Sequence, residues 1–151
     1  MLLSQEVKII LLLTFLTGSF CFGGSFNHDE TQNVKRKKRN VVFQFRKMIS
    51  CATGRSFWAY LPYGCYCGLG GSGIAVDDTD RCCKTHDDCY EQINREGICF
   101  FSPLWKWYRR SGCTGCASSN DNCGRRVCEC DGEAARCFAR STYNQKNKFR
   151  C

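Results

Sequence analysis

The stretch that decides the fold is residues 80–90, which read DRCCKTHDDCY. Within it, Cys82, His86 and Cys89 are spaced at i, i+4 and i+7, which places them on one face of a helix. We therefore predict a helix over about residues 81–93. Because two of the three residues on that face are cysteines suited to buried crosslinks, we expect His86 to point toward a packed neighbour.

A second long helix is expected over about residues 122–140. There Cys130 and Cys137 again lie seven residues apart, so each helix has a pair of cysteines on one face. The simplest arrangement is two antiparallel helices joined by two bridges. His86 would then face residues near Cys130, where Asp131 is the obvious carboxylate.

The cysteine content sets the class of protein. Fifteen cysteines in 151 residues is the composition of a disulfide scaffold and not of a cytosolic enzyme. Zinc is the rival use of so many cysteines, but the chain has two histidines, and its CxxC motif at 113–116 stands alone. The length suffices for one domain, and no internal repeat is present.

The first residues predict export. Lys8 precedes an apolar run at 9–16, which is too short to span a bilayer of about 30 Å but fits the core of a signal peptide. We take residues 1–22 as that signal, with an approximate boundary. No later segment is apolar enough to be transmembrane. The protein is therefore expected to be secreted and extracellular.

The basic run KRKKR at 35–39 has three interpretations. It could be a solvated charged run or a nuclear address, but behind a signal peptide a propeptide over residues 23–39 is favoured. The domain would then cover residues 40–151 and hold fourteen cysteines, an even number. Sixteen basic and eleven acidic residues remain, a formal charge of +5 that favours anionic lipid, nucleic acid or glycan without choosing among them.

A glycine-rich segment lies upstream of the helix at 81–93. Residues 63–73 contain five glycines, which rules out a helix and indicates a loop with positive-φ positions. Glycine loops usually cradle phosphates or turn sharply, and a histidine on a buried face is usually structural. The adjacent carboxylate of Asp87 adds another use, because calcium takes six to eight oxygen ligands, including backbone carbonyls.

These segments resemble those of the secreted phospholipases A2. Residues 63–73, YGCYCGLGGSG, are similar to the calcium loop of that family, and residues 80–90 are similar to its active-site helix. The resemblance runs from about Val41 to Cys151 and is closest to the pancreatic and elapid-venom class. It implies a mainly α, disulfide-rich fold with an N-terminal helix, a calcium loop, two long antiparallel disulfide-linked helices and a small β-hairpin.

On that template all fourteen cysteines of the domain are paired. The implied bridges are Cys51–Cys113, Cys65–Cys151, Cys67–Cys83, Cys82–Cys137, Cys89–Cys130, Cys99–Cys123 and Cys116–Cys128. The segments 51–65 and 99–113 look shortened against the pancreatic pattern.

The resemblance also implies the site, residue by residue. His86 would act as general base on a water that attacks the sn-2 carbonyl of a glycerophospholipid, and Asp131 would accept the other imidazole N–H. Tyr90 and Tyr108 would hydrogen-bond Asp131 and hold it in place. The Gly68 N–H would help to stabilise the oxyanion. One calcium ion would be held by the carboxylate of Asp87 and the carbonyls of Tyr66, Gly68 and Gly70.

Contact with lipid is the second requirement of that activity. Residues that match the family's channel mouth are Val42, Phe43, Phe57, Trp58 and Leu69. Trp105 and Trp107, with the cations Lys106, Arg109 and Arg110, form an expected interfacial patch, because tryptophan favours membrane interfaces and cations favour anionic headgroups. Phe100 and Phe101 fit this patch and the core equally well, and Phe45 fits the channel wall or the core.

The expected partners are phospholipid and a membrane or micelle surface, without nucleic acid, and the protein is expected to be a monomer. The alternative function is that of a non-catalytic phospholipase-like toxin or binding protein. Such relatives commonly lose the calcium-ligating aspartate or the histidine, whereas Asp87 and His86 are both present here.

Overall fold

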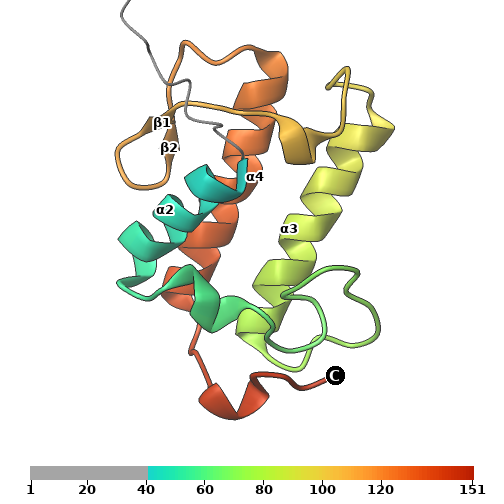
Figure 1. The fold of residues 1–151 in the computed structure, drawn as a ribbon, viewed down its shortest axis with the longest axis vertical. Coiled ribbons are helices and arrows are strands. Elements are labelled where there is room, and N and C mark those ends of the chain that lie inside the picture. Colours follow the sequence, from blue (N-terminus) through green and yellow to red (C-terminus); the bar gives the residue numbers. More distant parts are fainter. Residues whose placement is uncertain (1–40) are drawn as a thin grey trace, which may run out of the picture. The chain divides into compact units, whose positions relative to one another are not determined.

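The computed structural model describes residues 41–151; the expected signal peptide and propeptide lie outside these residues, as does Asn40. The elements, with η for short 3-10 helices, are α2 (Val41–Thr53), η1 (Phe57–Tyr60), α3 (Asp78–Arg95), η2 (Pro103–Trp105), β1 (Arg110–Ser111), β2 (Gly115–Cys116), α4 (Asn122–Arg140) and η3 (Gln145–Asn147) (Figure 1). The predicted mainly α fold with a small hairpin is confirmed.

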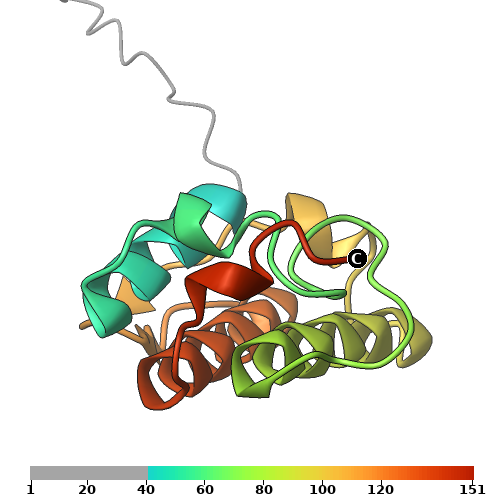
Figure 2. The ribbon, with the colours of Figure 1, turned by 90° about the horizontal axis from the view of Figure 1, so that it is seen from below.

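The two long helices α3 and α4 lie side by side (Figures 1 and 2). The bridges Cys82–Cys137 and Cys89–Cys130 join them in reversed chain order, which requires antiparallel axes. The predicted pair of antiparallel, doubly linked helices is therefore confirmed.

Helix α3 begins three residues before the predicted start at residue 81, because Asp77 caps it. The Asp77 carboxylate accepts the backbone N–H of Asp80 at 2.9 Å and so satisfies one of the free donors of the first turn. In the same way, Asp121 accepts the N–H of Gly124 at 2.7 Å and starts α4 at the predicted position.

Helix α2 and the 3-10 helices η1 and η2 lie on one side of the α3–α4 pair (Figure 2). The core lies between α2 and the two long helices. Its fully buried side chains include Met48, Ile49, Ile93, Val127 and Ala135. Within residues 41–151, no helix is both long enough and apolar enough to cross a membrane.

The hairpin is held closely against α4. Its two strands are antiparallel, with Arg110 opposite Cys116, and the bridge Cys116–Cys128 joins it to the helix. A Cβ at Gly132 would lie 2.3 Å from the Thr114 carbonyl oxygen, so the turn can approach α4 only where the helix has a glycine.

All seven bridges implied by the resemblance are present, and they include every cysteine of the described residues. Cys65–Cys151 ties the C-terminal segment to the glycine-rich loop. Such crosslinks stabilise a domain whose core is small.

Candidate active site

Helix α3 has two functional faces. One face lies against α4 and carries Cys82, His86 and Cys89. The other lies toward the glycine-rich loop and carries Asp80, Cys83 and Asp87. Residues three and seven apart share a helical face, so the two sets can run along the same helix without mixing.

His86 is held by a buried carboxylate of α4. Its Nε2 lies 2.7 Å from Oδ1 of Asp131, which is fully buried, whereas 16% of the His86 side chain is exposed. Since a carboxylate accepts hydrogen bonds, this contact places a proton on Nε2, so that the lone pair of the ring in its neutral form is on Nδ1. In that form the ring is oriented as a proton acceptor.

Phe45 of α2 fixes the plane of that ring. The two ring centroids are 4.4 Å apart, and the ring planes differ by 11°, which is a stacked arrangement. The structure therefore assigns Phe45 to the wall of the site, one of the two places that the sequence left open.

Two tyrosines complete the shell of Asp131. The Tyr90 hydroxyl donates to Oδ1 at 2.9 Å, and the Tyr108 hydroxyl donates to Oδ2 at 2.5 Å. Burial, followed by the negative charge of Asp131, raises the pKa of both phenols well above the ordinary value. Both hydroxyls therefore stay protonated and remain donors over the physiological pH range.

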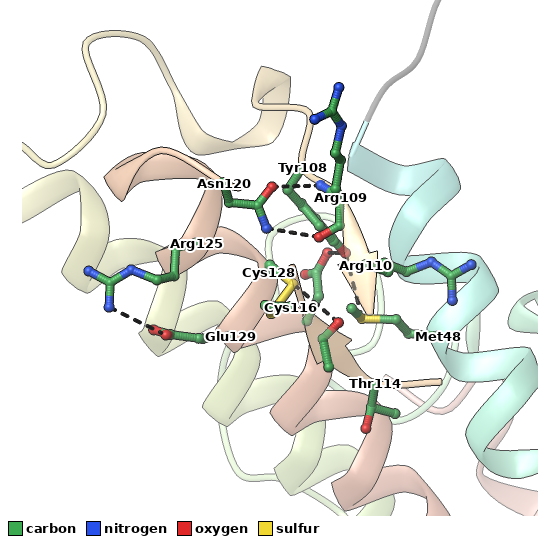
Figure 3. Close-up of a disulfide and its surroundings, with 12 residues drawn as sticks. Met48, Tyr108, Arg109, Arg110, Thr114, Cys116, Asn120, Arg125, Cys128 and Glu129 are labelled. Atoms are coloured by element: carbon green, nitrogen blue, oxygen red, sulfur yellow. Dashed lines mark hydrogen bonds and ion pairs between the residues drawn. A yellow bond between two sulfur atoms is a disulfide. The ribbon is translucent and has the colours of Figure 1, made fainter. Parts of the chain in front are cut away.

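The position of Tyr108 is set by the chain on either side of it. The Asn120 amide accepts the N–H of Arg109 at 2.7 Å and donates to the Arg109 carbonyl at 2.8 Å (Figure 3). On the core side, the Tyr108 hydroxyl lies 3.7 Å from the sulfur of Met48. The irregular segment that leads into β1 thus places the phenol at Asp131.

His86 and Asp87 line a cavity of about 490 Å³. Its walls are mainly apolar and include Val42, Phe45, Ile49, Leu69 and Leu104. The glycine-rich loop forms one side of the same cavity through residues 66–71. A mostly apolar cavity with a few polar groups on its wall is typical of a site for an apolar ligand with a polar reacting centre.

The Asp87 side chain lies at the wall of the cavity. Partial desolvation raises its pKa, the charge of His86 opposes that rise, and the neighbouring Asp88 adds to it. Within residues 41–151, no hydrogen bond or ion pair reaches this carboxylate, which is exposed at the wall of the cavity. The same part of the chain holds no group of three or more His, Cys, Asp or Glu side chains that could bind a metal. A cation at Asp87 would therefore need backbone oxygens as its other ligands.

The loop has the backbone conformation that a glycine-rich segment allows. Gly70 and Gly73 have φ of +74° and +89°. A Cβ at Gly71 would lie 2.6 Å from the Tyr66 Cα. The Gly68 N–H donates to the Tyr66 carbonyl at 2.8 Å, so these two groups are paired with each other here. That N–H must leave this bond before it can serve another acceptor.

The residues expected at a lipid interface do not all lie at the surface. Val42, Phe43, Trp58, Leu69 and Trp105 are exposed, as is Leu104, which the sequence had not indicated. Trp107 is half-buried. Phe57 is buried instead, because it packs edge-on against Phe45 in the cavity wall. Phe100 and Phe101 are 94% and 75% exposed, which excludes them from the core.

The cations expected near these aromatics are largely engaged with other groups. Lys106 Nζ lies 2.5 Å from the Asp121 carboxylate. Arg110 donates to the Gln44 side chain and to the Cys113 carbonyl. The ion pair with Asp121 therefore offsets one positive charge of this surface, whereas the neutral partners of Arg110 leave its charge in place.

The sequence did not single out Asp80. This fully buried carboxylate accepts three backbone N–H groups, those of Cys65, Tyr66 and Val76. An acidic run ahead of a helix is usually interpreted as a cap, which gives no reason to expect contacts with the loop. The i, i+3, i+7 spacing of Asp80, Cys83 and Asp87 is the signal that could have revealed it.

Known proteins resemble this chain over most of its described length. A protein-family model described as phospholipase A2 matches residues 42–148. Acidic phospholipase A2 DE-II from Naja melanoleuca is 48% identical over 110 residues, which cover 70% of this chain and 91% of the relative. Basic phospholipase A2 1 from Naja sagittifera is 45% identical over 119 residues, which cover 73% and 93%. The two-helix scaffold, the seven bridges and these matches agree, and the chain belongs to the phospholipase A2 family.

Proposed function

We propose that this chain is a calcium-dependent phospholipase A2, which hydrolyses the sn-2 ester of glycerophospholipids and releases a fatty acid and a lysophospholipid. The observation that carries the proposal is the hydrogen bond between His86 and the buried Asp131 at the wall of an apolar cavity, beside the carboxylate of Asp87. Relatives named phospholipase A2 support the same class of activity.

In the proposed mechanism His86 is the general base. Its Nδ1 takes a proton from a water as that water attacks the sn-2 carbonyl carbon, and the proton is later given to the leaving alcohol. Asp131 stabilises the imidazolium that forms between these steps, and Tyr90 and Tyr108 hold the carboxylate in place. Because the nucleophile is water, no serine or thiol is required; the cysteines of the domain are all bridged.

Asp87 and the glycine-rich loop together offer ligands that fit a calcium ion. Asp87 provides a carboxylate with no protein partner among residues 41–151, and hard cations take such carboxylates together with carbonyl oxygens. We assign the remaining protein ligands to the backbone carbonyls of Tyr66, Gly68 and Gly70. When bound, the ion supplies a Lewis acid that stabilises negative charge on the ester oxygen. We assign the Gly68 N–H, once it is released from the Tyr66 carbonyl, as a hydrogen-bond donor that also stabilises that oxygen.

Substrate is proposed to enter from a phospholipid surface. Val42, Leu69 and Leu104 line the cavity and are also exposed, so apolar surface continues from the cavity wall to solvent. Exposed tryptophan and phenylalanine next to such an opening favour contact with a membrane interface. Nucleic acid is not a proposed partner, and the proposed unit is a monomer.

The proposed route to the active form is secretion followed by cleavage. The disulfides favour an oxidising compartment. Removal of residues 1–22 and then of 23–39 would leave a chain that starts at Asn40, and N-terminal sequencing of the exported protein tests this assignment.

The test of the function measures fatty acid release. The chain cut after Arg39 is incubated with phosphatidylcholine vesicles, first with millimolar calcium and then with excess chelator. We expect release that depends on calcium. Absence of release with calcium would contradict the enzymatic function, and release that persists in chelator would contradict the role of the ion.

One variant and a matched control test the role of His86 separately from calcium binding. His86→Gln should lower turnover by about 10²-fold or more, because it removes the proton acceptor, while calcium binding measured by calorimetry is retained. Asp88→Asn is the control, since Asp88 is exposed and pairs with Lys84 on the same helix. Equal losses in the two variants would contradict the role of His86.

A further inference from the structure

Both ends of the segment that carries the proposed calcium ligands meet at one buried carboxylate. Asp80 Oδ2 accepts the N–H of Cys65 at 2.8 Å and the N–H of Val76 at 3.0 Å. Asp80 Oδ1 accepts the N–H of Tyr66 at 2.8 Å. One side chain of α3 thus fastens residues that precede and follow the proposed ligands Gly68 and Gly70.

The Asp80 carboxylate has little room to be replaced or to move. It is fully buried, and a Cβ at Gly64 would lie 2.2 Å from its Cγ. Gly64 has φ of +55°, so this contact joins a tight turn of the loop to the carboxylate. A buried charge is tolerated where hydrogen bonds satisfy it, and here three backbone donors do so.

Two further residues on the same face of α3 lie toward the loop, one and two helical turns beyond Asp80. Cys83 is bridged to Cys67 in the middle of the loop, and Asp87 lies at the level of the cavity. Asp80 and Cys83 therefore tie the two ends and the centre of the loop to one helix, and Asp87 lies on the same face of that helix at the cavity wall.

We infer that Asp80 is a positioning residue that orders the loop for calcium before the ion arrives. It touches neither the ion nor the substrate, and its role rests on the calcium site proposed above. By holding three backbone N–H groups it fixes the direction of the carbonyls between them, so the ion binds without first having to order the loop.

The test compares Asp80→Asn with Asp88→Asn. Both changes remove one negative charge from α3, but Asp88 makes no hydrogen bond to the loop. We expect Asp80→Asn to raise the calcium dissociation constant, measured by calorimetry, by about tenfold or more, because hydrogen bonds to a charged group are lost. Asp88→Asn should change it much less. Equal changes would show a pure charge effect and would overturn the inference.

Turnover against calcium concentration supplies a second readout. A residue that only orders the loop should shift the half-saturating calcium concentration and leave kcat at saturating calcium largely unchanged. A kcat that stays low at every calcium concentration would indicate general damage and would contradict the inference. Calcium binding by the unaltered protein is measured in the same series, so its absence would refute the proposed function, and its presence with an unchanged Asp80→Asn variant would refute this inference alone.

One measurement needs no variant and covers the case in which Asp80→Asn does not fold. In the calcium-free protein, hydrogen exchange of the Cys65, Tyr66 and Val76 amides should be much slower than that of Gly70, for which no hydrogen bond is expected. Equally fast exchange of all four amides would overturn the inference.

Discussion

Asp131 illustrates how a buried charge becomes useful at the scale of a single residue. Its two oxygens accept hydrogen bonds from His86, Tyr90 and Tyr108, and it has no exposed surface. The donors compensate the loss of hydration, and the fixed carboxylate in turn orients the imidazole. The two oxygens are not equivalent, since Oδ1 has two donors and Oδ2 has one.

Removal of the tyrosine hydroxyls should reveal that difference. Within residues 41–151, Tyr108 is the sole hydrogen-bond donor to Oδ2, so Tyr108→Phe leaves a buried acceptor unpaired and should cost about 1–3 kcal/mol of unfolding free energy. Tyr90→Phe should cost less, because Oδ1 keeps its bond to His86. Urea unfolding of both variants measures the difference.

Tyr60→Phe is the control for this pair. Tyr60 is also a buried tyrosine of the core, but its hydroxyl makes no bond to Asp131. A Tyr90→Phe variant as unstable as Tyr108→Phe would contradict the unequal pairing of the two oxygens.

Some of this site could be predicted from the sequence, and some could not. The seven-residue spacing of cysteines on two helices placed Asp131 opposite His86, because that argument needs only helical geometry. Asp80 was missed because its partners are backbone amides, which every residue except proline carries and which leave no mark in the sequence.

At the scale of elements, helix caps decide where the two long helices begin. Asp77 precedes α3 and also accepts the Tyr63 hydroxyl at 2.5 Å and the Asn147 amide at 2.6 Å. The residue therefore joins the helix start to the loop and to the C-terminal segment. An aspartate just before a helix is a common cap, but the added contacts could not be predicted from the sequence, because they come from residues 14 and 70 positions away.

The cap at Asp77 should make stability depend on pH. Burial alone would raise its pKa, but the hydrogen bonds from Tyr63 and from the Asp80 N–H outweigh this and lower it below the ordinary value of 3.8. A lowered pKa in the folded protein means stabilisation that is present above the unfolded pKa and is lost as the pH falls through the folded one.

We therefore expect Asp77→Ala to cost about 1–2 kcal/mol at pH 7. The difference from the unaltered protein should shrink as the pH falls below 3.8, where the carboxylate loses its charge. Urea unfolding at a series of pH values measures it. Asp78→Ala is the control, since Asp78 is exposed and pairs with Arg81 on the helix surface. A cost for Asp77→Ala that stays constant from pH 7 to pH 2 would contradict the role of its charge.

At the scale of the molecule, the exposed aromatics extend the apolar surface beyond the cavity. We call Phe100, Phe101, Leu104 and Trp105 the aromatic ridge. Leu104 belongs to the ridge and also lines the cavity, and Phe100, Phe101 and Trp105 line a second hollow of about 620 Å³. Composition could not decide whether these side chains lie inside or outside, because an aromatic residue suits a core and an interface equally.

The ridge should strengthen binding to lipid without taking part in the chemistry. Phe101→Ala combined with Trp105→Ala should weaken partition to phosphatidylcholine vesicles by about tenfold or more, because two large apolar side chains no longer leave water. Hydrolysis of a dispersed short-chain substrate should be unchanged. Sedimentation of vesicles and a soluble-substrate assay measure the two quantities.

Ile74→Ala serves as the comparison, since Ile74 is an exposed apolar residue that lines neither hollow. Two outcomes would contradict a role of the ridge in lipid contact. One is a ridge variant that binds vesicles as tightly as the unaltered protein. The other is a loss of activity on the dispersed substrate as large as the loss of vesicle binding.

The two faces of α3 also limit how this chain can change in length. One residue inserted or deleted between Asp80 and Asp87 would rotate the remainder of the helix by about 100°. His86 would turn away from Asp131, and Asp87 would turn away from the loop, in a single step. Segments such as 51–65 and 99–113 impose no such register, since connections between elements accommodate gaps at low cost. Insertions and deletions among natural variants should therefore gather in those connections and be absent from residues 80–89.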